Sequence, residues 1–256
     1  MMLNMTEIGE DSGQPPVLLA HGLLGSGKNL GGIARRLAQS RRVIMLDMRN
    51  HGDSFHDPDH SYPALADDLA QIIAAQGGQA DVLGHSMGGK AAMMLALTHP
   101  DLVRKLLVMD IAPHAYGHSQ TPLIDAMEAV ELTDLRLRSE ADARLARHVT
   151  EPGVRAFLLQ SLDLKSQPPR WRFNLTALRD QMSNLVGWPT DTPKAAFHGP
   201  ALFLAGAASD YCREPQVQAI REYFPEARIK FLAGAGHWLH ADRPAEVAEM
   251  AAEFLG

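Results

Sequence analysis

The chain has 256 residues, of which 46% are hydrophobic and 21% are charged, the usual balance of a globular protein. Its formal net charge of −6, with lysines and arginines scattered along the chain, argues against nucleic acid as the main partner. The lone cysteine, Cys212, excludes an intrachain disulfide and is typical of a reducing compartment. The first residues lack a secretory signal, and no apolar run approaches the roughly 20 residues that cross a bilayer. We therefore predict a cytoplasmic protein that binds neither nucleic acid nor a membrane.

Short apolar runs alternate with helical patterns up to residue 110. Buried strands are predicted at 16–22, 42–47, 80–84 and 105–110. Helices are predicted between them, one of which begins after the N-cap residue Ser61 and ends at Gly77. This alternation predicts an α/β fold with a mainly parallel sheet and helices on both faces.

The alternation stops between residues 112 and 197, where helical patterns recur and no convincing strand is found. It resumes with strands at 201–206 and 228–234, a helix at 214–224 and a last helix that opens at Pro244. We therefore predict that 1–111 and 198–256 form one α/β core. The segment 112–197 is predicted to be a helical insertion in this core.

The stretch GHSMG, residues 84–88, has the Gly-x-Ser-x-Gly spacing of a nucleophile elbow. It lies between a predicted strand and a predicted buried helix, which is the context that an elbow requires. Large side chains at 84 and 88 would clash with the neighbouring elements, and the helix N-terminus behind Ser86 favours negative charge. Ser86 is therefore the candidate nucleophile. The alternative is a surface serine in a glycine-rich turn.

A serine nucleophile needs a base that takes its proton. His237 follows the last predicted strand and a Gly-Ala-Gly turn, at the late position where this class of enzyme carries its histidine. His240 is the second histidine of the same stretch and leads into the final helix. We select His237 as the base and interpret most of the other histidines as surface or capping side chains.

Two aspartates are candidates for the acid that orients the base. Asp110 ends the strand that follows the elbow helix. Asp210 follows the next core strand, but it lies one residue beyond the common Gly-x-x-Asp position, which Ser209 occupies. Because a shift of one residue sends a side chain elsewhere, we prefer Asp110 and retain Asp210 as the alternative.

Acyl transfer also requires donors for the developing oxyanion. One donor is predicted to be the backbone N–H of Met87, directly after the nucleophile. The other is predicted in the loop HGLLGS (21–26), which follows the first core strand, with the N–H of Leu23 as the candidate.

Several motifs together resemble the α/β-hydrolase superfamily and, more narrowly, the YbfF-type bacterial esterases. They are HGLLGS (21–26), DMRNHGDS (47–54), GHSMGGK (84–90), MDIAP (109–113), WRFNL (171–175) and GAGHWLHADRP (234–244). The resemblance implies an α/β-hydrolase fold with a helical cap, inserted after the sixth strand, over a Ser-His-Asp site. It also implies hydrolysis of carboxyl esters or thioesters without a cofactor, and it places the acid at the MDIAP position, which supports Asp110.

We therefore predict a serine hydrolase that acts on small to medium acyl esters or thioesters through Ser86, His237 and Asp110. Other chemistry of the same triad (acyl transfer, carbon–carbon hydrolysis or elimination) stays open, as does a non-catalytic ligand-binding role. Trp171 and Phe173 either line an acyl pocket or pack the insertion against the core. No metal ligands are predicted, because Pro58 breaks the helix that would align His56 with His60.

Overall fold

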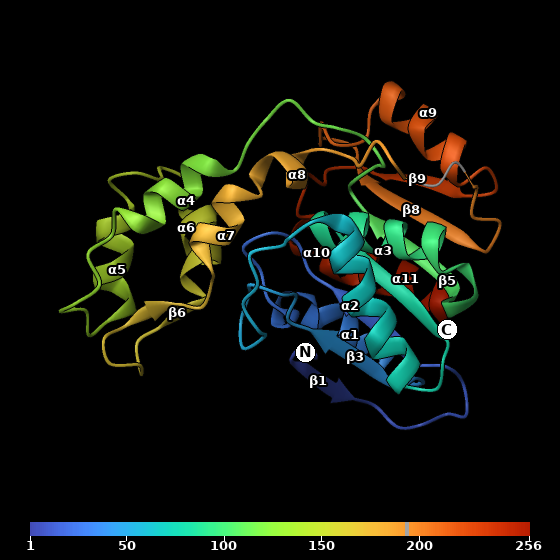
Figure 1. Cartoon of the computed structure of the whole chain (residues 1–256), viewed down its shortest axis with the longest axis horizontal. Coiled ribbons are helices and arrows are strands. Elements are labelled where there is room, and N and C mark those ends of the chain that lie inside the picture. The colour runs from blue at the N-terminus through green and yellow to red at the C-terminus, as the bar shows by residue number, and fades with distance from the viewer. Residues whose placement is uncertain (193–194) are drawn as a thin grey trace.

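In the computed structural model, which describes residues 1–192 and 195–256, seven strands form one sheet in the order β1-β3-β2-β4-β5-β8-β9 (Figure 1). Their bounds are β1 Met5–Ile8, β2 Val17–Ala20, β3 Val43–Leu46, β4 Ala80–His85, β5 Val103–Met109, β8 Ala201–Gly206 and β9 Arg228–Leu232. All neighbouring strands are parallel except β1, which pairs antiparallel with β3 at one edge. The predicted mainly parallel sheet is confirmed.

Successive side chains of each inner strand point to opposite faces of the sheet, and both faces are buried. In β2, Leu18 and Ala20 join one apolar cluster, and Val17 and Leu19 join the other. The first cluster packs against helices α2 Tyr62–Ala75, α3 Met87–Thr98 and α9 Glu214–Tyr223. The second packs against α1 Gly31–Leu37, the short α10 Leu239–Asp242 and α11 Pro244–Leu255. Helices therefore cover both faces, as predicted.

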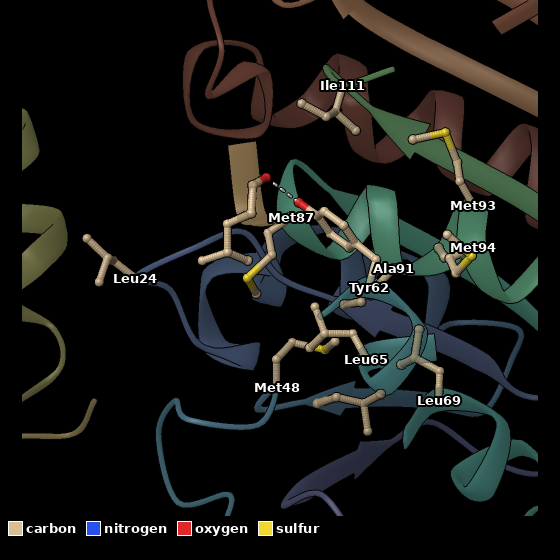
Figure 2. Packing of buried hydrophobic residues seen from close by; sticks show 14 of the residues in the cluster. Leu24, Met48, Tyr62, Leu65, Leu69, Met87, Ala91, Met93, Met94 and Ile111 are labelled. Atoms are coloured by element: carbon tan, nitrogen blue, oxygen red, sulfur yellow. Dashed lines mark hydrogen bonds between the residues drawn. The ribbon is translucent and has the colours of Figure 1, made fainter. Parts of the chain in front are cut away.

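The face covered by α2 and α3 holds a close-packed layer of apolar side chains (Figure 2). Leu65 and Leu69 of α2 are completely buried, as are Ala91 and Met93 of α3. Burial of each leucine or methionine side chain in this layer stabilises the fold by roughly 1.5–3 kcal/mol relative to exposure. This layer anchors the helix that begins directly after Ser86.

The segment between β5 and β8 forms a separate helical lobe beside the sheet (Figure 1). Its helices are α4 Thr121–Glu128, α5 Arg138–Leu145, α6 Pro152–Leu159, α7 Leu175–Asp180 and α8 Met182–Val186. The predicted insertion 112–197 includes residues 193–194, which lie outside the described residues.

Two details of the insertion differ from the prediction. It contains a small antiparallel pair, β6 Leu162–Asp163 and β7 Arg170–Trp171, where no strand was expected, because two residues per strand are too few to show a periodic pattern. The insertion also follows the fifth strand of the chain and not the sixth, because a single strand, β1, precedes β2. Two short 3-10 turns, η1 Gly27–Leu30 and η2 Pro100–Leu102, complete the elements of the core.

Candidate active site

Ser86 lies in a strained turn between β4 and α3. Its φ of +52° is in the region that residues with a side chain rarely adopt. A Cβ added to Gly84 would lie 2.3 Å from the carbonyl oxygen of Gly88, and one added to Gly88 would lie 2.3 Å from that of Ala20. The two glycines therefore let the turn pack tightly enough to present the serine at the end of the strand.

His237, in the loop that follows β9, lies next to this serine. Its Nε2 is 3.1 Å from Ser86 Oγ, and its Nδ1 is 2.8 Å from Asp110 Oδ2. A carboxylate only accepts hydrogen bonds, so Nδ1 carries the proton and Nε2 is left to accept from the serine hydroxyl. The ring stacks on that of Tyr211 with centroids 3.9 Å apart, and His85 donates to the His237 carbonyl across 2.9 Å.

Asp110 directly follows β5 and is held by the next strand of the sheet. Its φ is +50°, and its side chain is completely buried. One carboxylate oxygen accepts the N–H of Gly206 at 2.8 Å, and the other accepts the hydroxyl of Ser209 as well as the imidazole of His237. These donors fix the direction of the carboxylate toward the imidazole.

The structure does not bring Asp210 to this group. Its side chain is 96% exposed and lies 3.2 Å from the guanidinium of Arg213. Ser209, one residue earlier, is buried and points at Asp110 instead. The one-residue offset noted in the sequence therefore sends the two side chains in opposite directions.

The residues that carry the two predicted oxyanion donors, Met87 and Leu23, both line the cavity that holds Ser86. Met87 is the first residue of α3, and Leu23 lies in the loop after β2. Neither backbone N–H donates to another protein group within the parts of the chain that the structure describes. The N-terminus of α3 adds positive potential beside Ser86. Both N–H groups are thus free to receive an anionic oxygen.

A cavity extends from Ser86 and His237 to the helical insertion. From the core it is lined by Leu23, Tyr62, Met87, Lys90, Ile111 and Tyr211, among others. From the insertion it is lined by Gln120, Leu123, Phe157, Leu185 and Val186. The serine therefore faces a mainly apolar cavity with walls from both parts of the chain.

Trp171 and Phe173 do not line this cavity. Trp171 is buried and donates its indole N–H to the carbonyl of Met127 at 2.9 Å. The ring of Phe173 meets that of His51 edge-on, with centroids 5.4 Å apart. The structure gives both side chains the packing role that was the alternative in the sequence.

Lys90 lines the cavity, although it was not among the site residues predicted from the sequence. It is buried one turn after Ser86, and its Nζ donates to the carbonyl of Val186 at 3.2 Å and also to that of Gly187. The ammonium lies 5.3 and 4.8 Å from the ring centroids of Tyr62 and Tyr116. Burial lowers the pKa of Lys90 to about 7. Its signal in the sequence was a single charged residue in an otherwise apolar helix.

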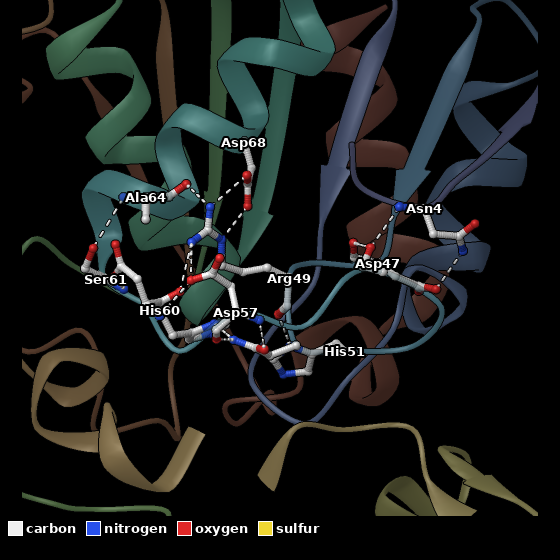
Figure 3. A network of polar contacts seen from close by, with 12 residues as sticks. Asn4, Asp47, Arg49, His51, Asp57, His60, Ser61, Ala64 and Asp68 are labelled. Atoms are coloured by element: carbon white, nitrogen blue, oxygen red, sulfur yellow. Dashed lines mark hydrogen bonds and ion pairs between the residues drawn. The ribbon is translucent and has the colours of Figure 1, made fainter. Parts of the chain in front are cut away.

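A polar network fixes the loop after β3, residues 47–54 (Figure 3). The Arg49 guanidinium pairs with the buried Asp68 of α2, with contacts of 2.6 and 2.8 Å. His60, which Pro58 separates from His56, is buried, and its Nδ1 lies 3.0 Å from the amide nitrogen of Asn50. Within residues 1–192 and 195–256, no group of three or more His, Cys, Asp or Glu side chains is arranged to hold a metal ion.

The sequence profile of the alpha/beta hydrolase fold matches residues 15–244. The chain belongs to the α/β-hydrolase family. Its sequence is 41% identical to Esterase YbfF of Escherichia coli (strain K12) over 244 residues, which are 94% of this chain and 92% of that protein. It is 39% identical to the sn-1-specific diacylglycerol lipase ABHD11 of Mus musculus, over 96% of this chain and 82% of that protein.

Among solved structures, this α/β hydrolase is similar to a marine microorganism esterase. The two superpose with a TM-score of 0.93 and share 36% identity, over 99% of each chain. The family and these relatives make the chain a hydrolase, and the resemblance to YbfF-type esterases is confirmed. In the part of the chain that is described, no helix has both the length and the apolar character to cross a membrane.

Proposed function

We propose that this α/β hydrolase is a serine esterase that cleaves small to medium acyl carboxyl esters or thioesters through an acyl-enzyme on Ser86. The observation that carries the proposal is the continuous contact from Ser86 Oγ to His237 Nε2 and from His237 Nδ1 to Asp110 Oδ2, at 3.1 and 2.8 Å. This is the geometry that a serine needs to act as a nucleophile. The relatives named as esterases and as a diacylglycerol lipase support an ester substrate.

In the proposed reaction, Ser86 Oγ attacks the carbonyl carbon of the ester while His237 Nε2 takes the hydroxyl proton. Asp110 holds the imidazole and stabilises its positive charge. The N–H groups of Leu23 and Met87 donate to the developing oxyanion. His237 then returns the proton to the leaving alcohol or thiol, and a water molecule activated by the same imidazole releases the acid.

We propose that the insertion acts as a cap that binds the acyl group. Phe157, Leu185 and Val186 of the insertion line the cavity that holds Ser86, which supports a site closed by both parts of the chain. Apolar walls favour an acyl chain over a charged group, because burial of each methylene contributes about 0.8 kcal/mol. The substrate is thus a small molecule that enters between the core and the insertion.

The test is hydrolysis of p-nitrophenyl acetate, butyrate and octanoate, with the matching acyl thioesters, by the wild type and by Ser86→Ala. We expect turnover by the wild type and a loss of about 10⁶-fold in kcat for Ser86→Ala, the scale seen for removal of a serine nucleophile. Ser139→Ala is the matched control, because Ser139 is exposed on α5 of the insertion. Equal turnover by wild type and Ser86→Ala would overturn the proposal.

A further inference from the structure

The loop that carries the Leu23 N–H is held by a hydrogen bond to an imidazole from the next loop of the core. The N–H of Gly25 donates to the carbonyl of Gly22 at 3.0 Å, which makes Leu23 and Leu24 the central residues of a tight turn. Leu24 has a φ of +57°, a conformation that glycine adopts readily and leucine does not. The Leu24 N–H donates to His51 Nε2 at 3.1 Å. This hydrogen bond holds the turn in a shape that its own sequence disfavours.

The tautomer of His51 is fixed by its other ring nitrogen. His51 Nδ1 is 2.8 Å from the carbonyl oxygen of Arg49, which only accepts hydrogen bonds. Nδ1 therefore carries the proton, and Nε2 presents a lone pair to the N–H of Leu24. The orientation of the ring is set further by the edge of Phe173.

The surroundings of His51 keep its imidazole neutral. The side chain is completely buried, and burial together with His21 and His60 lowers its pKa well below the ordinary value. The rings of His21 and His60 face it with centroids 5.1 and 5.6 Å away, and His56 adds a further unfavourable charge interaction when it is protonated. The Arg49 guanidinium is turned toward the carboxylate of Asp68 instead. A protonated His51 would have no acceptor left for Leu24.

A second neutral imidazole holds the same loop from its first residue. His21 Nδ1 lies 2.8 Å from the carbonyl oxygen of Gly22, and its Nε2 accepts the N–H of Met48 at 3.0 Å. Burial lowers the pKa of His21. The loop after β2 and the loop after β3 are thus joined by two imidazoles, one contributed by each loop.

We propose that His51 is a positioning residue for the oxyanion site, since it fixes the turn that aims the Leu23 N–H at the substrate. This inference rests on the proposed function, in which that N–H binds the oxyanion. Such a donor acts only if it lies about 2.7–3.1 Å from the place where the oxyanion forms. Loss of the His51 contact lets Leu24 relax toward an ordinary φ, which rotates the turn and withdraws the donor.

Two substitutions separate the acceptor of His51 from the rest of the ring. In His51→Asn, the amide nitrogen replaces Nδ1 and still donates to the Arg49 carbonyl, but nothing replaces Nε2. In His51→Gln, the amide oxygen lies as many bonds from Cα as Nε2 does and can accept the N–H of Leu24. Urea unfolding of both variants measures whether the fold is kept.

We expect His51→Asn to lower kcat for p-nitrophenyl butyrate by about 10²-fold, as loss of one oxyanion donor does. KM should change by less than about threefold, because the donor acts in the transition state and not on the bound ester. His51→Gln should regain at least about tenfold of the lost kcat, because its acceptor restores the aim of the donor. A purely structural role would not divide the effect between kcat and KM in this way.

The proposal would be overturned if folded His51→Asn had a kcat within about threefold of wild type, because loss of one oxyanion donor lowers kcat far more than that. It would also be overturned if the substitution changed only KM. If His51→Asn does not fold, folded His51→Gln decides alone, and a kcat about 10²-fold below wild type overturns the proposal. Failure of the proposed function is seen separately, as a wild-type enzyme that neither turns over esters nor reacts with a fluorophosphonate at Ser86.

Discussion

Asp110 Oδ2 lies 2.8 Å from His237 Nδ1, although the two residues follow different strands of the sheet. Their meeting depends on the parallel arrangement of β5, β8 and β9, whose carboxyl ends lie at one edge. Asp210, which also follows one of these strands, points into solvent. The contact separates the two aspartates that the sequence left as alternatives.

Replacement of Asp110 by asparagine is expected to lower kcat by at least about 10²-fold, because the amide keeps the shape but loses the charge that stabilises the imidazolium. In a serine protease with the same arrangement this change lowers kcat by about 10⁴-fold. Asp210→Asn is the matched control and is expected to stay within about tenfold of wild type. Steady-state kinetics on one ester measures both. A large loss of kcat in Asp210→Asn, together with a nearly normal kcat in Asp110→Asn, would make Asp210 the acid instead of Asp110.

The buried histidines predict a loss of stability in mild acid. Burial lowers the pKa of His60 to about 3 and that of His240 to about 4, and it also lowers those of His21, His51 and His85. In the unfolded chain these groups bind protons near pH 6.5, so the unfolded state binds more protons than the folded state below that pH. The stabilisation that these neutral histidines contribute is complete above about pH 6.5. It falls with decreasing pH until their pKa values in the folded chain are reached.

Below about pH 6.5, each such histidine is expected to lower the free energy of unfolding by about 1.4 kcal/mol for each unit of decrease in pH. Urea unfolding between pH 7 and pH 5, above the range in which most carboxylates titrate, measures the slope. His60→Gln should reduce the slope by about one proton equivalent. The same substitution at His148, exposed on the insertion, controls for the removal of a histidine as such. A free energy of unfolding that is constant from pH 7 to pH 5 would contradict the expectation.

The lowered pKa of Lys90 predicts that the stability of the protein depends on pH above pH 7. Its pKa is about 7 in the folded chain and near 10.4 when unfolded, so between these values the unfolded state binds the additional proton. The stability of wild type relative to Lys90→Met should therefore rise from pH 7 to pH 9.5, by more than about 1 kcal/mol. Urea unfolding of both proteins at the two pH values gives the difference. An unchanged difference would mean that Lys90 keeps the ordinary pKa of a lysine.

The close packing around Gly84 and the open space around Gly32 predict opposite effects for two glycine-to-alanine substitutions. Gly84→Ala places a Cβ 2.3 Å from a backbone oxygen and is expected to cost about 3 kcal/mol or more of stability. Gly32→Ala, in α1, meets no atom within 4 Å and should gain up to about 1 kcal/mol from helix propensity. Urea unfolding compares the two variants with wild type. A well-folded Gly84→Ala of normal stability would show that the turn is not tightly packed.

The sequence predicted the α/β core and the neighbourhood of Ser86 well, because strand–turn–helix patterns are local. The acid was harder to predict, since Asp110 and Asp210 both follow core strands and only the positions of the side chains distinguish them. The edge strand β1 was missed, because most of its residues are exposed and it lacks an apolar run.

The cavity was predicted least well. Trp171 and Phe173 were the aromatic candidates in the insertion, but both side chains pack against other parts of the protein. Phe157 lines the cavity instead. The stacking of Tyr211 on His237 joins residues far apart in the sequence, as does the contact of Lys90 with the rings of Tyr62 and Tyr116. Periodicity carries no information about such contacts, because it describes only which face of an element is buried.

The acyl-enzyme on Ser86 is tested most directly by the mass of the protein during turnover. Wild type is mixed with p-nitrophenyl acetate, quenched in acid, and analysed by intact mass and by peptide mapping. We expect one acetyl group per chain, attached to Ser86, and none on Ser86→Ala under the same conditions. Turnover of the ester by wild type with an adduct on another residue, or undiminished turnover by Ser86→Ala, would contradict this expectation.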